Sequence, residues 1–244
     1  MDQASVYAIR TRYGQVRERI DAAARKAGRN PDSVRLVVVT KTHPLETVRA
    51  ALEVGIRDLG ENYAEEAVEK IQAIGALEGL CWHMIGHVQS RKADLVAQNF
   101  NFMQSLDSLK LANRLERFAA EAGRILPVLL ECNVGGEESK FGYPAFEQAR
   151  WEALRADAQQ IAQLPHLEIR GLMTMPPLFD DAEKTRPFFQ KLRELRDYLS
   201  KRVPQAKWGE LSMGTSADFT AAVEEGATLV RVGTAILGAR PPKS

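Results

Sequence analysis

The sequence predicts an α/β fold, a closed (β/α)8 barrel in which eight parallel strands alternate with helices. Short apolar runs typical of buried parallel strands recur along the chain. A segment of helical periodicity follows each run, and no linker or break in composition interrupts the alternation. We therefore expect one domain over residues 1–244, with residues 1–30 forming an extra helix that packs on the barrel.

The first expected element is an amphipathic helix over residues 4–28. Its apolar residues recur at helical spacing between arginines, and they are Val6, Ile9, Tyr13, Val16, Ile20 and Ala23. Gly28 ends the helix, and the pair Asn30-Pro31 prevents its continuation.

The strands and helices of the barrel follow in strict alternation. The eight expected strands are residues 34–41, 58–62, 82–86, 102–107, 126–133, 167–174, 208–213 and 229–233. The expected helices are residues 44–54, 63–74, 89–97, 108–122, 145–164, 181–202 and 216–225, with a short helical turn after the last strand. Glycine or proline ends several helices, as at Gly55, Gly123 and Pro165. Eight such units in about 210 residues fit a closed barrel.

An open, doubly wound sheet is the alternative fold. It is disfavoured because no glycine-rich dinucleotide fingerprint follows the first strand, where Thr40 to Pro44 stand instead. The longest irregular stretch, residues 134–143, is rich in glycine and follows a strand, which makes it a candidate lid or binding loop.

Composition excludes several classes of function. The net charge is +1 with acidic and basic residues mixed, so a nucleic-acid-binding surface is not expected. No apolar run approaches the roughly 18 residues of a membrane span, and the N-terminal region lacks a signal-peptide core. The two cysteines, Cys81 and Cys132, have no metal-type spacing and indicate a reduced, cytoplasmic protein.

Metal sites are not expected either. His83 and His87 are four residues apart, but they lie on a strand and its exit rather than on a helix.

Lys41 is the first candidate for chemistry. It follows the run Leu36 to Val39, and strand alternation places it on the same face as Val37 and Val39. Partial burial there disfavours the ammonium form and frees a nucleophilic amine, as Schiff-base formation requires. The alternative is a lysine that extends from the strand end into water.

In a barrel, polar residues with a function gather at the carboxyl ends of the strands. The residues at these ends are Lys41, Asn62, His83 with His87, Asp107, Asn133, Thr174, Ser212 to Ser216, and Arg231 to Thr234. Loops after strands seven and eight hold a phosphate in many barrels. Here those loops contain Ser212, Gly214, Thr215 and Ser216, then Gly233 and Thr234, and both precede helical segments that favour anions. Ordinary helix caps are the alternative reading.

Arg231 is expected to point into the barrel, because it alternates with Val230 and Val232. A buried arginine is costly unless it is paired. It either pairs with a barrel carboxylate, such as Glu210 or Asp107, or faces a ligand nitrogen. Pyridoxal 5′-phosphate (PLP) combines such a nitrogen with an aldehyde for Lys41 and a phosphate for the two loops.

The sequence resembles the pyridoxal-phosphate homeostasis proteins. The matching segments fall in order over about residues 34–240, and they are Val39 to Thr42, Gly60 to Tyr63, Trp82 to Gly86 with Gln89 and Lys92, Gly171 to Met173, Ser212 to Ser216, and Arg231 to Thr234. The resemblance implies a barrel like the N-terminal domain of alanine racemase. One departure is Thr215, where relatives often carry methionine, and a backbone N–H contact would survive that change.

The resemblance also implies roles for the site residues. Lys41 would hold PLP as a Schiff base, and Arg231 would face the ring nitrogen. The phosphate would lie on Ser212, Gly214, Thr215, Ser216, Gly233 and Thr234, with Asn62 and His83 beside the ring.

Three functions are compatible with these residues. The first is a non-catalytic protein that holds and buffers PLP and passes it to apo-enzymes, which we expect to be monomeric. Alanine racemases add a β-rich domain with a catalytic tyrosine, whereas this chain ends after the eighth unit, so no catalytic residues are assigned. The second is a small racemase that uses His83 or Tyr63. The third is an aldolase-type barrel in which Lys41 reacts with a sugar phosphate.

Overall fold

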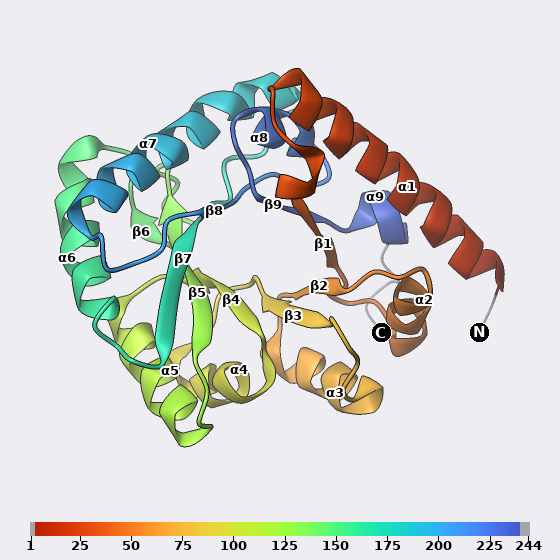
Figure 1. Ribbon diagram of the computed structural model, residues 1–244, viewed down its shortest axis with the longest axis horizontal. Coiled ribbons are helices and arrows are strands. Elements are labelled where there is room, and N and C mark those ends of the chain that lie inside the picture. Colours follow the sequence, from red (N-terminus) through yellow and green to blue (C-terminus); the bar gives the residue numbers. More distant parts are fainter. Residues whose placement is uncertain (1–2, 240–244) are drawn as a thin grey trace.

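Parallel strands close into a barrel in the computed structural model, which describes residues 3–239 (Figure 1). The barrel strands are β1 (Arg35–Val39), β2 (Asp58–Glu61), β3 (Cys81–Met84), β4 (Phe102–Leu106), β5 (Leu126–Asn133), β7 (Leu167–Met173), β8 (Glu210–Ser212) and β9 (Leu229–Val232). Each strand pairs with the next in this order, and β9 pairs with β1, which closes the ring. All of these pairings are parallel, so the predicted eight-stranded parallel barrel is confirmed.

Helices surround the strands on the outside (Figure 1). They are α1 (Gln3–Lys26), α2 (Leu45–Glu53), α3 (Ala64–Ile74), α4 (Ala93–Asn99), α5 (Leu109–Glu121), α6 (Trp151–Ile161), α7 (Arg186–Arg202), α8 (Phe219–Glu224) and α9 (Thr234–Leu237). Short 3-10 turns are η1 (Pro31–Ser33), η2 (Ser90–Lys92), η3 (Gln148–Arg150) and η4 (Ala182–Thr185). Helix α9 has only 4 residues, and α1 packs against α2, α8 and α9. The N-terminal helix therefore covers the side of the barrel that the short last helix leaves open.

Several boundaries differ from those expected. Strand β1 ends at Val39 rather than residue 41, because the N–H of His43 bonds the carbonyl of Thr40 in a turn. Thr42 in that turn has a φ of 62°, which a continuing strand does not allow. The helix expected over 145–164 is shorter, with η3 followed by α6. The stretch expected to be irregular ends in the short strand β6 (Tyr143–Pro144), which pairs with the end of β5.

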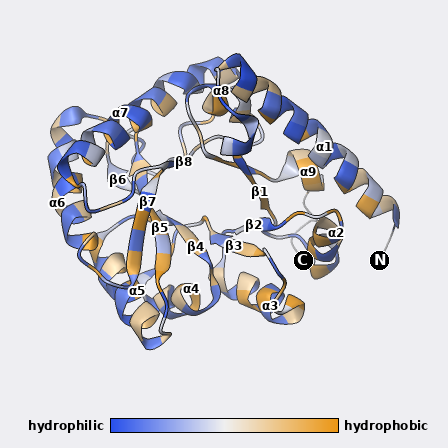
Figure 2. Cartoon of the chain, in the orientation of Figure 1, coloured by the Kyte–Doolittle hydropathy of each residue, from blue (hydrophilic) through white to orange (hydrophobic). Residues whose placement is uncertain are grey.

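Two apolar cores hold the fold together. The larger lies between the strands and the surrounding helices. The smaller fills the barrel interior with Val37, Phe102, Leu129, Met173 and Leu229. Figure 2 shows apolar residues along β5 and β7, whereas the outer helices alternate apolar and polar positions. Burial of these side chains, at about 25 cal/mol for each Å² of apolar surface, is the main stabilising contribution.

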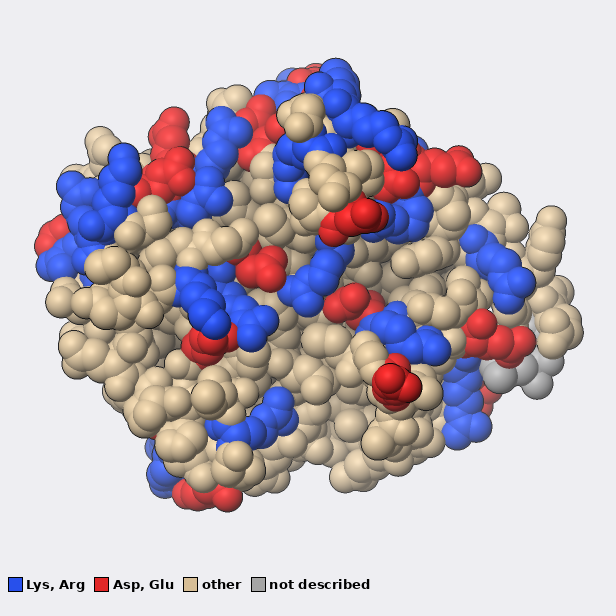
Figure 3. Space-filling view, viewed as in Figure 1, with Lys and Arg blue, Asp and Glu red and all other residues tan. Residues whose placement is uncertain are grey.

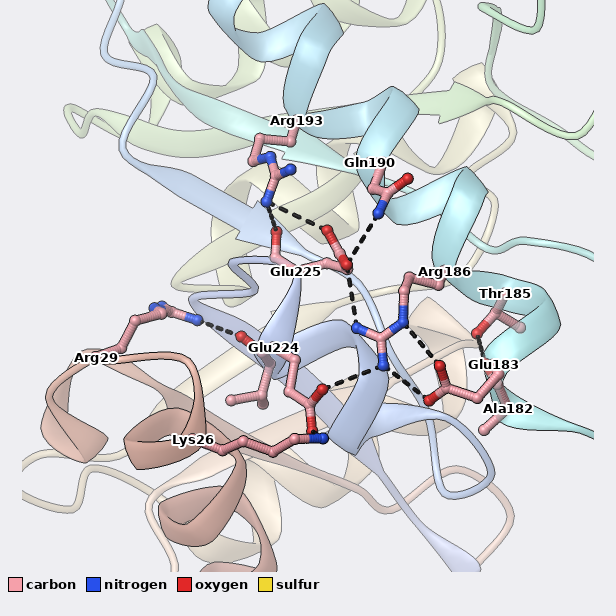
Figure 4. A network of polar contacts seen from close by, with 11 residues as sticks. Lys26, Arg29, Ala182, Glu183, Thr185, Arg186, Gln190, Arg193, Glu224 and Glu225 are labelled. Atoms are coloured by element: carbon pink, nitrogen blue, oxygen red, sulfur yellow. Dashed lines mark hydrogen bonds and ion pairs between the residues drawn. The ribbon is translucent and has the colours of Figure 1, made fainter.

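A cluster of ion pairs joins α8 to its neighbours (Figure 4). Arg186, the first residue of α7, bonds Glu224 at 3.1 Å and Glu225 at 3.0 Å. Lys26 at the end of α1 reaches Glu224 at 2.8 Å, and Arg193 reaches Glu225 at 3.2 Å. These contacts fix α8, and with it the loop that enters α8 from β8.

Charges of both signs are interspersed over the face shown in Figure 3. Cys81 and Cys132 are both free thiols. Within residues 3–239, no helix combines the length and the apolar character that crossing a membrane would need.

Candidate functional site

A cleft of about 660 Å³ opens at the carboxyl ends of the strands. Its lining combines an amine, a guanidinium, amide and hydroxyl groups and a buried carboxyl with apolar side chains. The residues are Val39, Lys41, Asn62, Ile85, Gly86, His87, Glu131, Ser139, Lys140, Phe141, Met175, Leu178, Thr215, Ser216, Ala217, Arg231, Gly233 and Thr234. A mixture of apolar walls and a few converging polar groups is typical of a small-molecule site.

Most of the predicted site residues meet in this cleft. Those that line it are Lys41, Asn62, Thr215, Ser216, Arg231, Gly233 and Thr234. They come from the ends of β1, β2, β8 and β9, which closure of the barrel brings together. His83, Ser212 and Gly214 are not part of the lining among the residues that the structure describes.

Lys41 lies just beyond the end of β1, in the same cleft as Val39. The turn that carries it is held from α3. The ammonium of Lys70 donates to the carbonyl oxygen of Thr40 at 3.0 Å and to Glu66 at 2.6 Å. Glu66 also accepts the backbone N–H of Thr42 at 2.8 Å. The peptide groups on both sides of Lys41 are thus anchored to one buried lysine.

A second acid completes this anchor. Glu61 is fully buried and accepts from Lys70 at 2.8 Å and from the Thr40 hydroxyl at 2.7 Å. Burial raises the pKa of Glu61, and the neighbouring ammonium of Lys70 opposes that rise.

Asn62 follows the end of β2, and its backbone packs closely against Gly86. A Cβ at Gly86 would lie 2.4 Å from the Asn62 carbonyl oxygen, so only glycine permits this approach. The Asn62 side-chain oxygen is buried and has no hydrogen-bond partner. A buried polar atom without a partner costs free energy that a bound donor would recover.

Arg231 is 3% exposed and points into the barrel, as the alternation of β9 predicts. Its guanidinium donates to the Ser212 hydroxyl, to the Thr174 carbonyl oxygen at 2.8 Å and to the Met175 sulfur at 3.0 Å. Burial lowers the pKa of Arg231 to about 10, with Asp218 and Glu131 opposing the shift, so the group stays charged at neutral pH.

The carboxylates considered as partners of Arg231 are engaged elsewhere. Glu210 bonds Arg35 at 3.2 Å and Asp107 bonds His87 at 2.9 Å. The hydrogen bonds found for the guanidinium thus go to uncharged groups, which leaves its charge available to a ligand in the cleft.

Two tight turns border the cleft after β8 and β9. Gly214 has a φ of 91°, and a Cβ there would lie 2.5 Å from that of Ala222, so this turn requires glycine. Asp218 accepts the backbone N–H of Thr215 at 2.7 Å and its hydroxyl at 3.0 Å. The second turn leads from Gly233 into α9, whose first N–H groups have no partner within the helix.

His83 and Ser212 occupy the barrel interior below the cleft. His83 is fully buried, and its ring nitrogens meet Asp58 at 2.8 Å and Gln104 at 2.9 Å. Ser212 donates to the Gln104 side-chain oxygen at 2.6 Å. Strand alternation predicts that both face inward, but their depth depends on the stagger of the tilted strands.

Glu131 also lines the cleft, although it was not predicted to do so. Its carboxyl group lies in the cleft, is 8% exposed and has one oxygen without a hydrogen-bond partner. Burial raises the pKa of Glu131 to about 7, and Asp107 adds to the shift while Arg231 and Lys140 oppose it. An acid that directly follows the apolar residues Leu126 to Leu130 of β5 is the signal that could have identified it.

The loop of residues 134–143 contributes Ser139, Lys140 and Phe141 to the cleft wall. The Phe141 ring stacks on His87, with ring centroids 3.7 Å apart. Asn133 closes the base of the loop by accepting the N–H of Gly136 at 2.8 Å. The segment that we expected to be a lid or binding loop therefore lies at the cleft.

Asp58, Cys81 and His83 are close enough together to suggest a metal site. The Gln104 side-chain oxygen accepts a hydrogen bond from the Ser212 hydroxyl, so the Gln104 amide nitrogen faces His83 Nδ1. Nδ1 is then an acceptor, and the ring proton lies on Nε2, where a metal would have to bind. We therefore interpret His83 and Asp58 as a hydrogen-bonded pair rather than as ligands of a metal centre.

Known proteins resemble this chain over nearly its whole length. Residues 12–241 match the family described as "Alanine racemase, N-terminal domain". A "Pyridoxal phosphate homeostasis protein" of Pasteurella multocida is 39% identical over 95% of this chain and 97% of its own length. Another, of Pseudomonas aeruginosa, is 41% identical over 95% and 96%. The chain belongs to the pyridoxal phosphate homeostasis protein family.

Solved structures extend the comparison to this family's fold. PipY of Synechococcus elongatus, solved with PLP bound, is 36% identical with a TM-score of 0.81, covering 94% of this chain and all of that one (100%). An alanine racemase of Clostridium difficile has a TM-score of 0.68 at 16% identity, and the match covers 97% of this chain but 57% of the racemase. The racemase likeness concerns the barrel fold alone.

Proposed function

We propose that this protein binds PLP in the cleft through Lys41 and holds it for supply to apo-enzymes, without catalytic turnover. The observation that carries the proposal is the shared position of Lys41, Arg231 and the two turns after β8 and β9 in one cleft. PLP supplies a reactive aldehyde, a phosphate and a ring nitrogen when bound. Each of these groups has a chemically matched partner among the residues of the cleft.

The cleft also fits such a ligand in size and polarity. Its volume of about 660 Å³ lies in the usual range for small-molecule sites. Asn62 and Glu131 each have a buried side-chain oxygen without a partner, which would suit a ligand that donates hydrogen bonds. Glu131, with a pKa near 7, also has a protonated form that donates.

We assign roles on this basis. The Lys41 amine forms the covalent link, and Asn62 lies beside the ring. The turn residues Thr215, Ser216, Gly233 and Thr234 hold the phosphate with backbone N–H and hydroxyl groups. Arg231 faces the ring nitrogen.

His83, Ser212 and Gly214 do not line the cleft in the described part of the chain, and we propose that they support the site from beneath. The first two belong to the polar interior of the barrel, and Gly214 shapes the turn that presents Thr215.

Arg231 supports holding rather than turnover. A guanidinium donates hydrogen bonds and accepts none, so Arg231 would keep the ring nitrogen of bound PLP unprotonated, and the ring would then withdraw fewer electrons. Tyr63 and His83, the two residues that a racemase could use here, are not placed for catalysis. Tyr63 is 49% exposed, His83 is fully buried, and neither lines the cleft in the described part of the chain.

Incubation of the PLP-loaded protein with single enantiomers of amino acids tests this choice. We expect the chirality to stay unchanged, while an added apo-enzyme gains activity as PLP passes to it. Racemisation on the order of 1 per second would assign the chain to catalysis instead. A protein that takes up no PLP at all would contradict the binding proposal itself.

We further propose that the protein is a cytoplasmic monomer and that residues 134–143 close over the bound ligand. The free thiols of Cys81 and Cys132 suit a reducing compartment. Sedimentation at micromolar concentration tests the monomer, and protection of the 134–143 amides from hydrogen exchange upon PLP addition tests the closure.

A further inference from the structure

A continuous chain of hydrogen bonds crosses the barrel interior from the cleft to the opposite end. It begins at Arg231, passes through Ser212, Gln104 and His83, and ends at Asp58. Ser212, Gln104 and His83 are all fully buried. Asp58 is the first residue of β2 and lies at the amino end of the strands. We call these five residues the interior relay.

Every hydrogen bond in the interior relay is donated in the same direction, from Arg231 toward Asp58. Arg231 only donates, so the Ser212 oxygen accepts and its hydrogen goes to the Gln104 oxygen. The Gln104 nitrogen then donates to His83 Nδ1, and His83 Nε2–H donates to Asp58. Reversing the Gln104 amide would place two donors at the Ser212 oxygen and deprive its hydroxyl of an acceptor. Each link therefore fixes the orientation of the next.

The protonation of His83 agrees with this direction. Burial lowers the pKa of His83, although the bond to Asp58 opposes the shift. A neutral ring carries one proton, which is the one donated to Asp58. Asp58 is further balanced by Arg35 at 3.9 Å.

We propose that Gln104 and His83 are positioning residues that hold the Arg231 guanidinium toward the bound ring through Ser212. The proposal rests on the proposed function, because Arg231 requires a ring nitrogen to face. Arg231 lacks a hydrogen-bonded carboxylate among the contacts found, so neutral partners alone set the plane of its guanidinium. Of these, the Ser212 hydroxyl is the one whose orientation depends on the relay.

Ligand discrimination tests this role. The probes are PLP and its analogue with CH in place of the ring nitrogen, and the readout is the ratio of their dissociation constants. We expect the native protein to prefer PLP on the order of tenfold, as one hydrogen bond from a charged donor provides. Gln104→Met, His83→Leu and Ser212→Ala should each reduce that preference to about threefold or less. His83→Gln, which keeps one acceptor and one donor, should retain most of it.

Matched controls separate positioning from general damage. Met103 precedes Gln104 on β4 and is buried in the larger core, between the strands and the helices. Met103→Leu should therefore leave the ratio unchanged. Ser216→Ala, in the turn after β8 that we propose holds the phosphate, should weaken the binding of both ligands equally. Wild-type preference in Gln104→Met and Ser212→Ala would overturn the proposal.

Binding of the two ligands to the native protein has two further informative outcomes. Equal binding of both ligands would mean that Arg231 makes no ring-nitrogen contact, which overturns the relay's role but leaves PLP binding intact. Binding of neither ligand would contradict the proposed function instead.

A measurement on the unaltered protein covers the case in which interior variants fail to fold. Long-range ¹H–¹⁵N correlation spectra distinguish the two neutral forms of a histidine ring. We expect His83 at pH 7 to be neutral with its proton on Nε2. A proton on Nδ1 would require Gln104 to be reversed, and the interior relay would then be broken.

Discussion

Lys70 donates a hydrogen bond to the carbonyl oxygen of Thr40 over 3.0 Å. Thr40 directly precedes Lys41, whereas Lys70 lies one turn before the end of α3. Through Glu66 the same ammonium also anchors the N–H of Thr42. Lys41 thus stands on a turn that a second, buried lysine holds on both sides.

Replacement of Lys70 by alanine should therefore destabilise the protein by about 3–5 kcal/mol, because Glu61 would be left buried beside no cation. We also expect weaker PLP binding, because the turn that carries Lys41 loses its anchor. Urea unfolding and PLP titration measure the two effects.

Lys92→Ala is the matched control for this change. Lys92 also pairs with a glutamate of α3, Glu65, but both side chains are partly exposed. Exposed pairs contribute about 1 kcal/mol or less. Equal losses of stability in the two variants would mean that the contacts of Lys70 with Glu61 and Glu66 contribute no more than a surface ion pair.

Gly86→Ala should displace Asn62 from the cleft, because the new Cβ would lie 2.4 Å from the Asn62 carbonyl oxygen. We expect a stability loss of about 1–3 kcal/mol, as for other overpacked sites, and weaker PLP binding. Gly14→Ala in α1 is the control, since nothing lies within 4 Å of its Cβ. It should stabilise the helix by about 0.5–1 kcal/mol. Full PLP affinity in Gly86→Ala would argue against a role for Asn62.

Glu131 predicts a pH dependence of stability in the ligand-free protein. Its pKa rises from 4.5 to about 7 on folding, so between these pH values the folded state keeps a proton that the unfolded state releases. Stability contributed by this group therefore falls as pH rises through that window, by up to about 3 kcal/mol, and stays low above it.

Glu131→Gln removes the titrating group and should abolish that fall. Chemical denaturation at pH 5 and pH 8 measures it, and the variant should gain most over the native protein at pH 8. A gain of the same size at both pH values would show that Glu131 does not titrate in this window.

Apolar runs and strand alternation were enough to predict the barrel and part of the site. The run Leu36 to Val39 identifies β1, and Lys41, Val39 and Arg231 share the cleft as alternation predicts, although Lys41 lies beyond the end of the strand. The turn at Thr40 to Thr42 was not predictable, because it depends on Lys70, which lies 30 residues further along the chain.

Depth within the barrel was the part that sequence could not supply. His83 and Glu131 both face inward, yet His83 lies in the interior and Glu131 reaches the cleft. Strand tilt and stagger decide this, and they follow from closure of the whole sheet. Gln104 was not predicted for a related reason. Its hydrogen bonds to His83 and Ser212 form only when β3, β4 and β8 face one another.

Borohydride reduction of the PLP-treated protein, followed by mass mapping of its peptides, tests the central claim most directly. Lys41→Ala serves as the control, and it should fold but lose the modified peptide. We expect one pyridoxyl group per chain, attached to Lys41, with Lys140 of the same cleft unmodified. An unmodified Lys41, or a label found on Lys140 in its place, would contradict the account.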